Sequence, residues 1–369
     1  MNALDALAGV LRLRPGEARP GGVVNHRPDW AGTLARGKSP TEMPALLGSL
    51  HNLCGHAHRL CSQMALRAAE HGNVQADAGA ARALQGETLR EHARRILLDW
   101  PGALWAATTG DATLSLRCCP ALRSRDTDPL DTRLWLQRHL LGMPAADWLR
   151  GWDTEIDWLA EWSETAHGWL PVLVREARAA ADWPVAAAKP LHVHSGAVSL
   201  RQLATCLREA PGDTRQPRWL DACAETGSWT RLHGAARAMP ATPWQRLGAR
   251  LAELVRMNLP DEPGRTGDGW LAFGALQIAP GEALGWVEMA RGLLVHHVML
   301  DGAAVPRVAS YRVLAPTDWN FHADGAVAAA LEYLRPAETA RIAALMAAYD
   351  PCVRFEVETQ AVEEEGAHA

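Results

Sequence analysis

Two stretches near the C-terminal end of the chain have the apolar pattern of β-strands. They are Leu293–Leu300 and Ser310–Leu314, and the segment DGAAVPR between them carries turn residues. Two such runs joined by a short turn predict a β-hairpin. At the other end, Val10 to Arg14 alternates between apolar and polar residues, which predicts a short, half-exposed strand. The stretch from Pro15 to Pro28 is expected to be a loop.

Most of the remaining chain has the apolar spacing of helices. Helices are predicted over Trp30–Ala35, Thr41–Leu66, 74–99, 134–182, Thr242–Leu259, Gly325–Arg335 and Ala337–Tyr349. Residues 183–219 read instead as loop and short strand, with Lys189–His194 as a candidate β segment. Tryptophans such as Trp148 and Trp152 recur at helical spacing, which favours a packing role for them.

These patterns together predict one compact, mainly helical α+β domain over residues 1–358, with the hairpin as its clearest β element. A loop rich in Pro, Gly and acidic residues is expected at Asp261–Gly269. The short acidic tail Thr359–Ala369 is expected to be disordered.

Composition and charge narrow the classes of function. The 369 residues carry a net charge of −5, so no electrostatic attraction favours nucleic acid. No apolar run approaches the roughly 20 residues of a membrane-spanning helix, and the N-terminus lacks the pattern of a signal peptide. The seven cysteines are odd in number and scattered, which is unlike a disulfide framework. A cytoplasmic protein is therefore expected.

One cluster of candidate metal ligands stands out inside the predicted helix Thr41–Leu66. It contains Cys54, His56, His58 and Cys61. Positions 54, 58 and 61 share a helical face, so a local zinc site is one interpretation. Structural zinc sites usually combine two distant ligand pairs, however, and no second pair occurs in the sequence. The alternative, in which His56 and His58 face solvent or a partner, is favoured, and the roles of His56, His58 and Cys61 stay open.

Four segments resemble motifs of the large subunit of nickel–iron hydrogenases. The C-terminal part matches the pattern E-x-x-R-G-x-L-x-H, followed by a hairpin and P-[ST]-T-W-N, at Glu288, Arg291, Gly292, Leu294, His296, Pro316, Thr317, Trp319 and Asn320. The segment from Asp350 to Cys352 matches the start of D-P-C-x-x-C-x-x-H. Cys54 and Gly55 match C-G in R-I-C-G-x-C-x-x-x-H, and Glu225–Arg231 is similar to E-x-G-P-L-A-R. The resemblance runs from about Val10 to Glu358 and implies a large-subunit-like fold.

The departures from these motifs fall on the catalytic centre. Catalytic subunits hold nickel and iron with four thiolates, of which this chain keeps Cys54 and Cys352. Ala57 and Phe355 stand where the other two cysteines would be, and the proton-relay Glu of the family corresponds to Gly32. Further differences from the motif ligands and their neighbours are Asn52, Cys61 and Glu358.

The pattern of losses resembles the hydrogenase accessory proteins of the HupK/HoxV type, which are degenerate relatives of the large subunit. The resemblance implies a non-catalytic scaffold that transiently holds iron with two cyanides and one carbon monoxide, and no nickel, before transfer to the large subunit precursor. Cys54 and Cys352 would bind the iron, and Arg291, Pro316 and Thr317 would hold the cyanides by hydrogen bonds. The implied partners are that precursor and hydrogenase maturation chaperones, with no nucleic acid and no membrane.

This interpretation predicts a particular geometry. The sulfurs of Cys54 and Cys352 should face one small cavity, with Arg291 and the Pro316-Thr317 backbone on its other side. Ala57 and Phe355 should partly fill the space where nickel would lie. Alternative interpretations are a divergent catalytic subunit with Cys61 or Glu358 as substitute ligands, and a metal-free structural partner of the hydrogenase. A simple ion pair of Arg291, with Glu288 for example, is the structural alternative for that residue.

Overall fold

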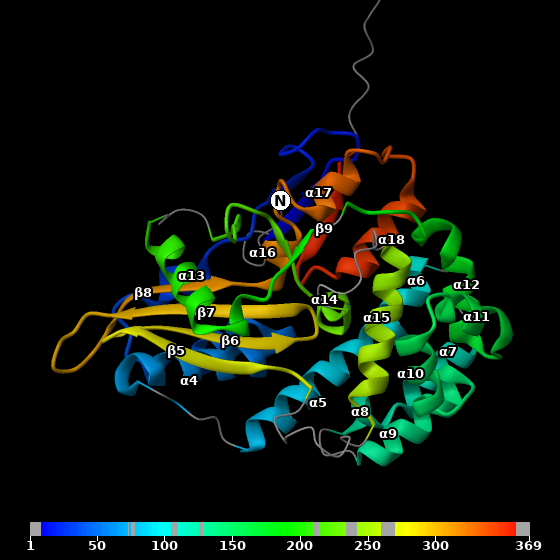
Figure 1. Ribbon diagram of the computed structural model, residues 1–369, viewed down its shortest axis with the longest axis horizontal. Helices are drawn as coiled ribbons and strands as arrows, with labels where there is room; N and C mark the ends of the chain where they lie inside the picture. Colours follow the sequence, from blue (N-terminus) through cyan, green and yellow to red (C-terminus); the bar gives the residue numbers. More distant parts are fainter. Residues whose placement is uncertain are drawn as a thin grey trace, which may run out of the picture.

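The protein is described by a computed structural model. It describes the following residues: 9–72, 74, 78–104, 110–124, 128–186, 188–209, 214–233, 242–259 and 270–358. The expected loop at Asp261–Gly269 and the expected disordered tail Thr359–Ala369 lie outside these residues. Figure 1 shows a four-stranded sheet on the left and a group of helices on the right, with both ends of the motif-bearing chain near the top.

The sheet is an antiparallel meander with the strand order β5-β6-β7-β8. Its strands are β5 (Phe273–Ala279), β6 (Glu282–Met289), β7 (Gly292–Leu300) and β8 (Val308–Leu314). Strands β7 and β8 confirm the predicted hairpin, with His296 opposite Val313. The first two strands were not predicted, because the glycines and charged residues in FGALQIA and EALGWVEM interrupt the alternation that marks a half-buried strand.

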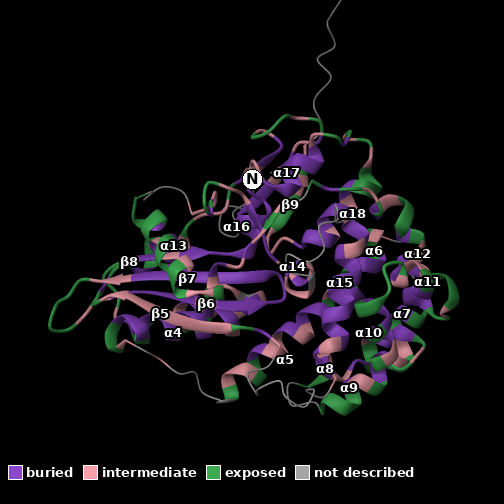
Figure 2. Ribbon diagram, in the orientation of Figure 1, coloured by how far each residue is buried: buried purple, intermediate pink, exposed green. Residues whose placement is uncertain are grey.

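Alternating side chains of the sheet enter two different cores. Leu294 and Val298 of β7 pack on one face with α4 (Gly55–His71), whereas Leu293 and Val295 pack on the other face with α13 (Ala197–Glu209). In Figure 1, α13 lies in front of the sheet and α4 behind it. Figure 2 shows that β6 and β7 are buried along most of their length.

The helical part of the molecule surrounds α15 (Pro243–Arg256), which begins with a capping box at Thr242 and is buried along nearly all of its length. The other helices of this part are α5 (Ala78–Arg94), α6 (Trp100–Leu104), α7 (Gly110–Cys118), α8 (Pro120–Arg123), α9 (Pro129–Leu136), α10 (Ala145–Thr154), α11 (Trp158–Thr165), α12 (Trp169–Ala181), α14 (Ser228–His233), α17 (Ala326–Leu331) and α18 (Thr339–Tyr349). The packing role of the tryptophans is confirmed, since Trp148 and Trp162 are buried and meet edge to face at 5.6 Å.

Several predicted element boundaries were wrong. The helix predicted over Thr41–Leu66 is two helices, α3 (Met43–Leu50) and α4, separated by the non-helical backbone of His51 and a 3-10 turn at Asn52–Cys54. The helix predicted over 74–99 is α5 followed by a π turn. Helix α13 was missed inside a region expected to be loop, and the candidate β segment is a strand only at Lys189–Pro190.

A second sheet joins the two ends of the motif-bearing chain. Strand β1 (Val10–Leu13) was predicted, and it pairs with β2 (Val23–Asn25), which lies within the expected loop, and in parallel with β9 (Arg354–Val357). Consequently, the residues after α18 return to the N-terminal part of the chain. In the parts of the chain that are described, no helix combines the length and the apolar character needed to span a bilayer.

Candidate functional site

A cavity of about 390 Å³ lies where the N-terminal, central and C-terminal motifs meet. Its wall includes the two predicted metal ligands, two histidines, an arginine and an aspartate: Cys54, Cys352, His51, His58, Arg27 and Asp318. We call this space the cysteine cavity. The structure therefore brings Cys54 and Cys352, about 300 positions apart in the sequence, to the wall of one cavity.

Cys54 lies at the end of the 3-10 turn that precedes α4, and only 7% of its surface is exposed. Burial raises the pKa of the Cys54 thiol well above its ordinary value. The nearby thiol of Cys352 raises this pKa further, and the positive charge of Arg291 opposes both effects. Cys54 is consequently protonated in the metal-free protein, and a metal would have to displace the proton.

Cys352 follows the C-terminal end of α18 and is held by Thr317 in the first turn of α16 (Pro316–Asn320). The Thr317 hydroxyl donates to the Cys352 sulfur at 3.1 Å, and it accepts from the Cys352 backbone N–H at 3.2 Å. Pro316 and Thr317 are both buried. Thr317 therefore contacts the predicted ligand Cys352 directly, while the wall of the cavity beside it comes from Ala315 and Asp318.

Arg27 is a cavity residue that the sequence did not indicate. It lies just before Pro28, in a segment that carried no motif, and its Nη1 donates to Asp318 Oδ1 at 2.7 Å. Burial alone would lower the pKa of Arg27, but Asp318, Cys352 and Cys54 outweigh burial and raise it. Arg27 thus supplies a permanent positive charge to the wall that holds both thiols.

Arg291 is also buried and charged, but it lines a neighbouring pocket and not the cysteine cavity itself, contrary to prediction. Its Nη2 donates to Glu91 at 3.1 Å and its Nε lies 3.2 Å from Asp350 Oδ2, so Glu288 is not its partner. Within the described part of the chain, Nη1 of Arg291 is buried and has no hydrogen-bond partner. One donor of this guanidinium is therefore available to another group.

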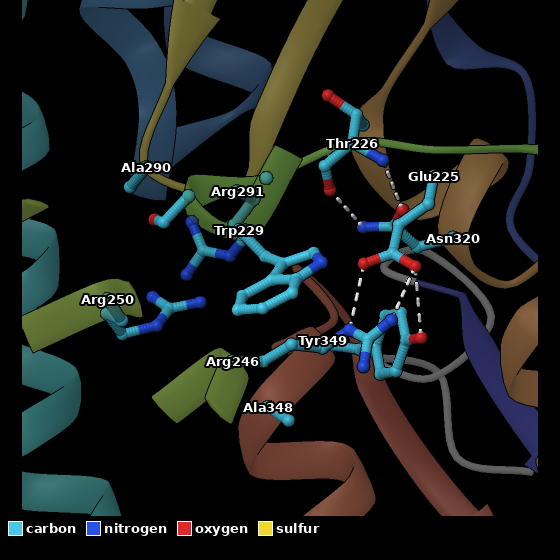
Figure 3. Close-up of a pocket in the computed structure, with 12 residues that line it drawn as sticks. Glu225, Thr226, Trp229, Arg246, Arg250, Ala290, Arg291, Asn320, Ala348 and Tyr349 are labelled. Carbon is cyan, nitrogen blue, oxygen red and sulfur yellow. Dashed lines mark hydrogen bonds and ion pairs between the residues drawn. The ribbon is translucent and has the colours of Figure 1, made fainter. Parts of the chain in front are cut away.

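The neighbouring pocket, which we call the charged pocket, encloses only about 20 Å³. Figure 3 shows Arg291, Arg250 and Trp229 on one side of it and the Glu225 carboxylate on the other. Arg246 donates to Glu225 through Nε and Nη2 at 2.8 and 2.7 Å, and the Tyr349 hydroxyl adds a third hydrogen bond. This pocket is nearly filled by its own ion pairs.

The segments that carry the motifs approach one another closely around Arg291. Gly292 has a φ of +131°, and a Cβ there would lie 2.5 Å from the Thr226 side chain, so glycine is required after Arg291. Thr226 and Asn320 exchange two hydrogen bonds of 2.9 Å, also visible in Figure 3. The matched Gly292 and Asn320, together with Thr226, thus position Arg291 and α16 relative to each other.

The residues that replace lost ligands have different surroundings. Ala57 is fully buried, but Phe355 is 37% exposed on β9, so the prediction that Phe355 fills the cavity is wrong. Strand pairing with β1 is the reason, because it fixes the direction of the Phe355 side chain. Glu358 forms an ion pair with Arg14 at the molecular surface.

The local zinc interpretation has no geometric support. His58 turns its Nδ1 to His296 at 3.1 Å, and the Cys61 thiol faces the Leu294 carbonyl at 4.0 Å. Among the residues that the structure describes, no group of three or more His, Cys, Asp or Glu side chains is arranged to hold a metal.

Comparisons with known proteins agree with the motif assignment. No family model matches the chain. It is 38% identical to the hydrogenase expression/formation protein HoxV of Cupriavidus necator strain H16, over 97% of both chains. It is 30% identical to the hydrogenase expression/formation protein HupK of Rhizobium leguminosarum bv. viciae, over 91% of both chains.

Solved structures with a similar arrangement are hydrogenases. A NiFeSe hydrogenase from Desulfovibrio vulgaris Hildenborough aligns with 89% of this chain over 92% of the hydrogenase chain. The sequence identity is 12% and the TM-score is 0.48. An NAD+-reducing NiFe hydrogenase covers 90% and 93% at 16% identity and a TM-score of 0.49. At these scores the likeness supports no statement about shared chemistry. The identity to HoxV and HupK over nearly the whole length is decisive, and the chain belongs to the HupK/HoxV family of hydrogenase expression/formation proteins.

Proposed function

We propose that this protein is a non-catalytic scaffold in hydrogenase maturation. Its cargo is an iron ion that carries two cyanides and one carbon monoxide, held transiently before transfer to the precursor of the hydrogenase large subunit. The names of its relatives support the accessory role in hydrogenase formation. The cargo and its transfer are what the resemblance of the motifs implies, and the residues of the cysteine cavity support the cargo.

The observation that carries the proposal is the meeting of Cys54 and Cys352 at one cavity. Its volume of about 390 Å³ lies within the range of about 300–1,000 Å³ that is usual for small-molecule sites. Two thiolates are soft ligands suited to iron, and a cargo that brings three diatomic ligands of its own needs few more from the protein. The Thr317 hydroxyl, 3.1 Å from the Cys352 sulfur, orients one of these two ligands.

Two guanidinium groups suit the anionic character of such a cargo. Arg27 lines the cavity, and the charges of Arg27 and Arg291 both act on Cys54 and Cys352. Arg27, whose guanidinium lines the cavity, can donate to a cyanide nitrogen, whereas Arg291 acts on the thiols through its charge from the neighbouring pocket. A charge-assisted hydrogen bond of this kind is stronger than a neutral one, particularly away from water.

Hydrogen turnover is not part of the proposal. The family's proton-relay carboxylate and two of its four thiolates are replaced by Gly32, Ala57 and Phe355. The protein would therefore bind and orient the iron group, and release it to the large subunit precursor with the help of maturation chaperones.

Infrared spectroscopy of protein isolated from hydrogenase-producing cells tests the proposal. Wild-type protein should show cyanide and carbonyl stretching bands, and Cys54→Ser and Cys352→Ser should each lose them. Cys119→Ser is the matched control for a buried cysteine and Cys206→Ser for an exposed one, and both should keep the bands. A wild-type protein without these bands, or bands that survive Cys54→Ser, would contradict the scaffold.

The same preparations separate the alternative functions. Nickel in the protein together with hydrogen-dependent dye reduction would indicate a divergent enzyme. Binding to the large subunit precursor without any infrared bands would indicate a structural partner. Arg27→Lys keeps the positive charge but loses the planar donor fork, so it should fold normally and retain less of the iron group.

A further inference from the structure

A chain of four side chains, one half-buried and three buried, leads from the cysteine cavity to the face of the sheet that packs against α4. His51 and His58 line the cavity, and their rings stack with centroids 3.7 Å apart. Nδ1 of His58 lies 3.1 Å from Nε2 of His296, and Nδ1 of His296 lies 2.8 Å from the Tyr311 hydroxyl. His58 thereby has one ring nitrogen committed to the sheet, and Nε2 is the polar atom it can offer to the cavity.

The fold brings these residues together through strand register and one close approach. His296 on β7 lies opposite Val313 on β8, so Tyr311, two residues from Val313, is on the same face of the sheet as His296. Helix α4, which carries His58, packs against this face. Gly285 on β6 permits this approach, because a Cβ there would lie only 2.6 Å from the Cys61 carbonyl oxygen.

All members of the chain are neutral. Burial lowers the pKa of His296 to about 3 and that of His51 to about 4, and it lowers the pKa of His58 well below the ordinary value. Burial also raises the pKa of Tyr311 well above its usual value, so the phenol keeps its proton. A neutral imidazole has one donor and one acceptor nitrogen, and a chain of such rings therefore has a single direction.

Tyr311 sets that direction. The Ser62 hydroxyl lies beside the Tyr311 oxygen and stabilises it as a donor would, so the proton of the buried Tyr311 hydroxyl goes to Nδ1 of His296 at 2.8 Å. His296 then carries its proton on Nε2 and donates to Nδ1 of His58. His58 in turn carries its proton on Nε2, on the side of the cysteine cavity.

We propose that Tyr311, His296 and His58 present a neutral N–H donor to the cysteine cavity, where it binds the nitrogen of a cyanide ligand on the iron group. His58 is the binding residue, and His296 and Tyr311 are positioning residues. This inference rests on the proposed scaffold function and adds a recognition element to it. A fixed donor favours cyanide, a good hydrogen-bond acceptor, over carbon monoxide, a poor one, and so orients the bound group.

The protonation pattern can be tested on metal-free protein. Nitrogen NMR of protein with 15N-labelled histidine should show the His58 ring protonated on Nε2, with the assignment made by loss of its signals in His58→Gln. Tyr311→Phe removes only the hydroxyl that fixes the direction of the hydrogen bonds. The rings of His296 and His58 should then be a mixture of the two tautomers. Finding His58 protonated on Nδ1 in the wild type would overturn the inference.

The recognition of cyanide can be tested on protein from hydrogenase-producing cells. Tyr311→Phe and His296→Gln should shift a cyanide infrared band relative to the wild type. The matched control is His297→Gln, since His297 is the adjacent buried histidine, points to the opposite face of β7 and bonds Glu282 at 2.8 Å. Its bands should stay in the wild-type position.

Cyanide bands that do not move in Tyr311→Phe would overturn the inference while leaving the scaffold intact. Absence of the bands from the wild type would instead contradict the scaffold, and the role of His58 toward cyanide would fall with it. The NMR result separates these outcomes, because it reports the hydrogen-bond chain whether or not iron is bound.

Discussion

The two neighbouring cavities differ in how their polar groups are occupied. In the charged pocket, which encloses about 20 Å³, Glu225, Arg246 and Tyr349 satisfy one another. In the cysteine cavity, of about 390 Å³, the two thiols line open space, and the Arg27 guanidinium donates to Asp318. Residues that resemble hydrogenase motifs occur at both places. Those in the charged pocket hold the fold together, and those in the cysteine cavity are the ones that we propose hold a ligand.

Arg291 lies at the boundary between the two. Two of its nitrogens interact with Glu91 and Asp350, as in a structural ion pair, and the third has no partner among the described residues. Burial alone would raise the pKa of Asp350, but Arg291, Arg250 and Arg95 outweigh it and hold that pKa below its ordinary value. A resemblance to a motif therefore does not by itself distinguish a residue that binds from one that supports.

The largest expected effect is on the charged pocket. Arg246→Met would leave the Glu225 carboxylate buried without its bidentate partner, which should lower the free energy of unfolding by about 3–5 kcal/mol. Urea unfolding measures this loss. The exposed pair of Arg341 and Glu338 is the control, and Arg341→Met should cost under about 1 kcal/mol. Equal losses in the two variants would show that the ion pair of the charged pocket contributes no more to folding than an exposed pair.

Acidification should act on the histidines beside the cysteine cavity. His51 and His296 have folded pKa values of about 4 and about 3, below the value near 6.5 of an unfolded chain. The folded state thus binds fewer protons than the unfolded chain. The free energy of unfolding that depends on these neutral histidines is fully present above pH 6.5 and is lost as the pH falls toward 4. Each fully buried histidine contributes on the order of 3 kcal/mol to this loss.

The variant that checks this origin is His296→Gln, in which the fall of unfolding free energy between pH 6.5 and 4 should be shallower than in the wild type. Urea unfolding at several pH values gives the slope directly. An unchanged slope would place the acid-sensitive groups elsewhere in the molecule.

The smallest effect is expected at Thr317. Thr317→Val removes the hydroxyl that donates to the Cys352 sulfur and accepts from its backbone N–H, at a cost of about 1 kcal/mol in unfolding free energy. The infrared bands should persist at reduced intensity, because Thr317 orients a ligand but does not replace it. Complete loss of the bands with no change in stability would instead make Thr317 an essential contact of the iron group.

Much of the architecture was contained in local patterns. The alternation at Val10 to Arg14 and the two runs around DGAAVPR predicted real strands, and the Thr242 start of α15 was also correct. These elements agree with expectation because their apolar residues form clear alternating or continuous runs that turn residues or a helix cap bound. Strands β5 and β6 and helix α13 were missed, because their local sequences are ambiguous and only packing on both faces of the sheet makes them regular.

By itself, the sequence determined which residues of the hydrogenase large-subunit motifs are retained, and in which order. They are the two cysteines, the Arg-Gly pair and the Pro-Thr pair. Tertiary structure alone decided which of them share a cavity, because Cys54, before α4, and Cys352, between α18 and β9, line one wall only in the folded chain. It also placed Arg27 in the wall, moved Phe355 to the surface and connected His58 to Tyr311. Such contacts depend on strand register and on how closely a helix approaches the sheet. His58 and its partners on the sheet, for example, are about 240 or more positions apart in the sequence. Contacts over such separations have no local signature in the sequence.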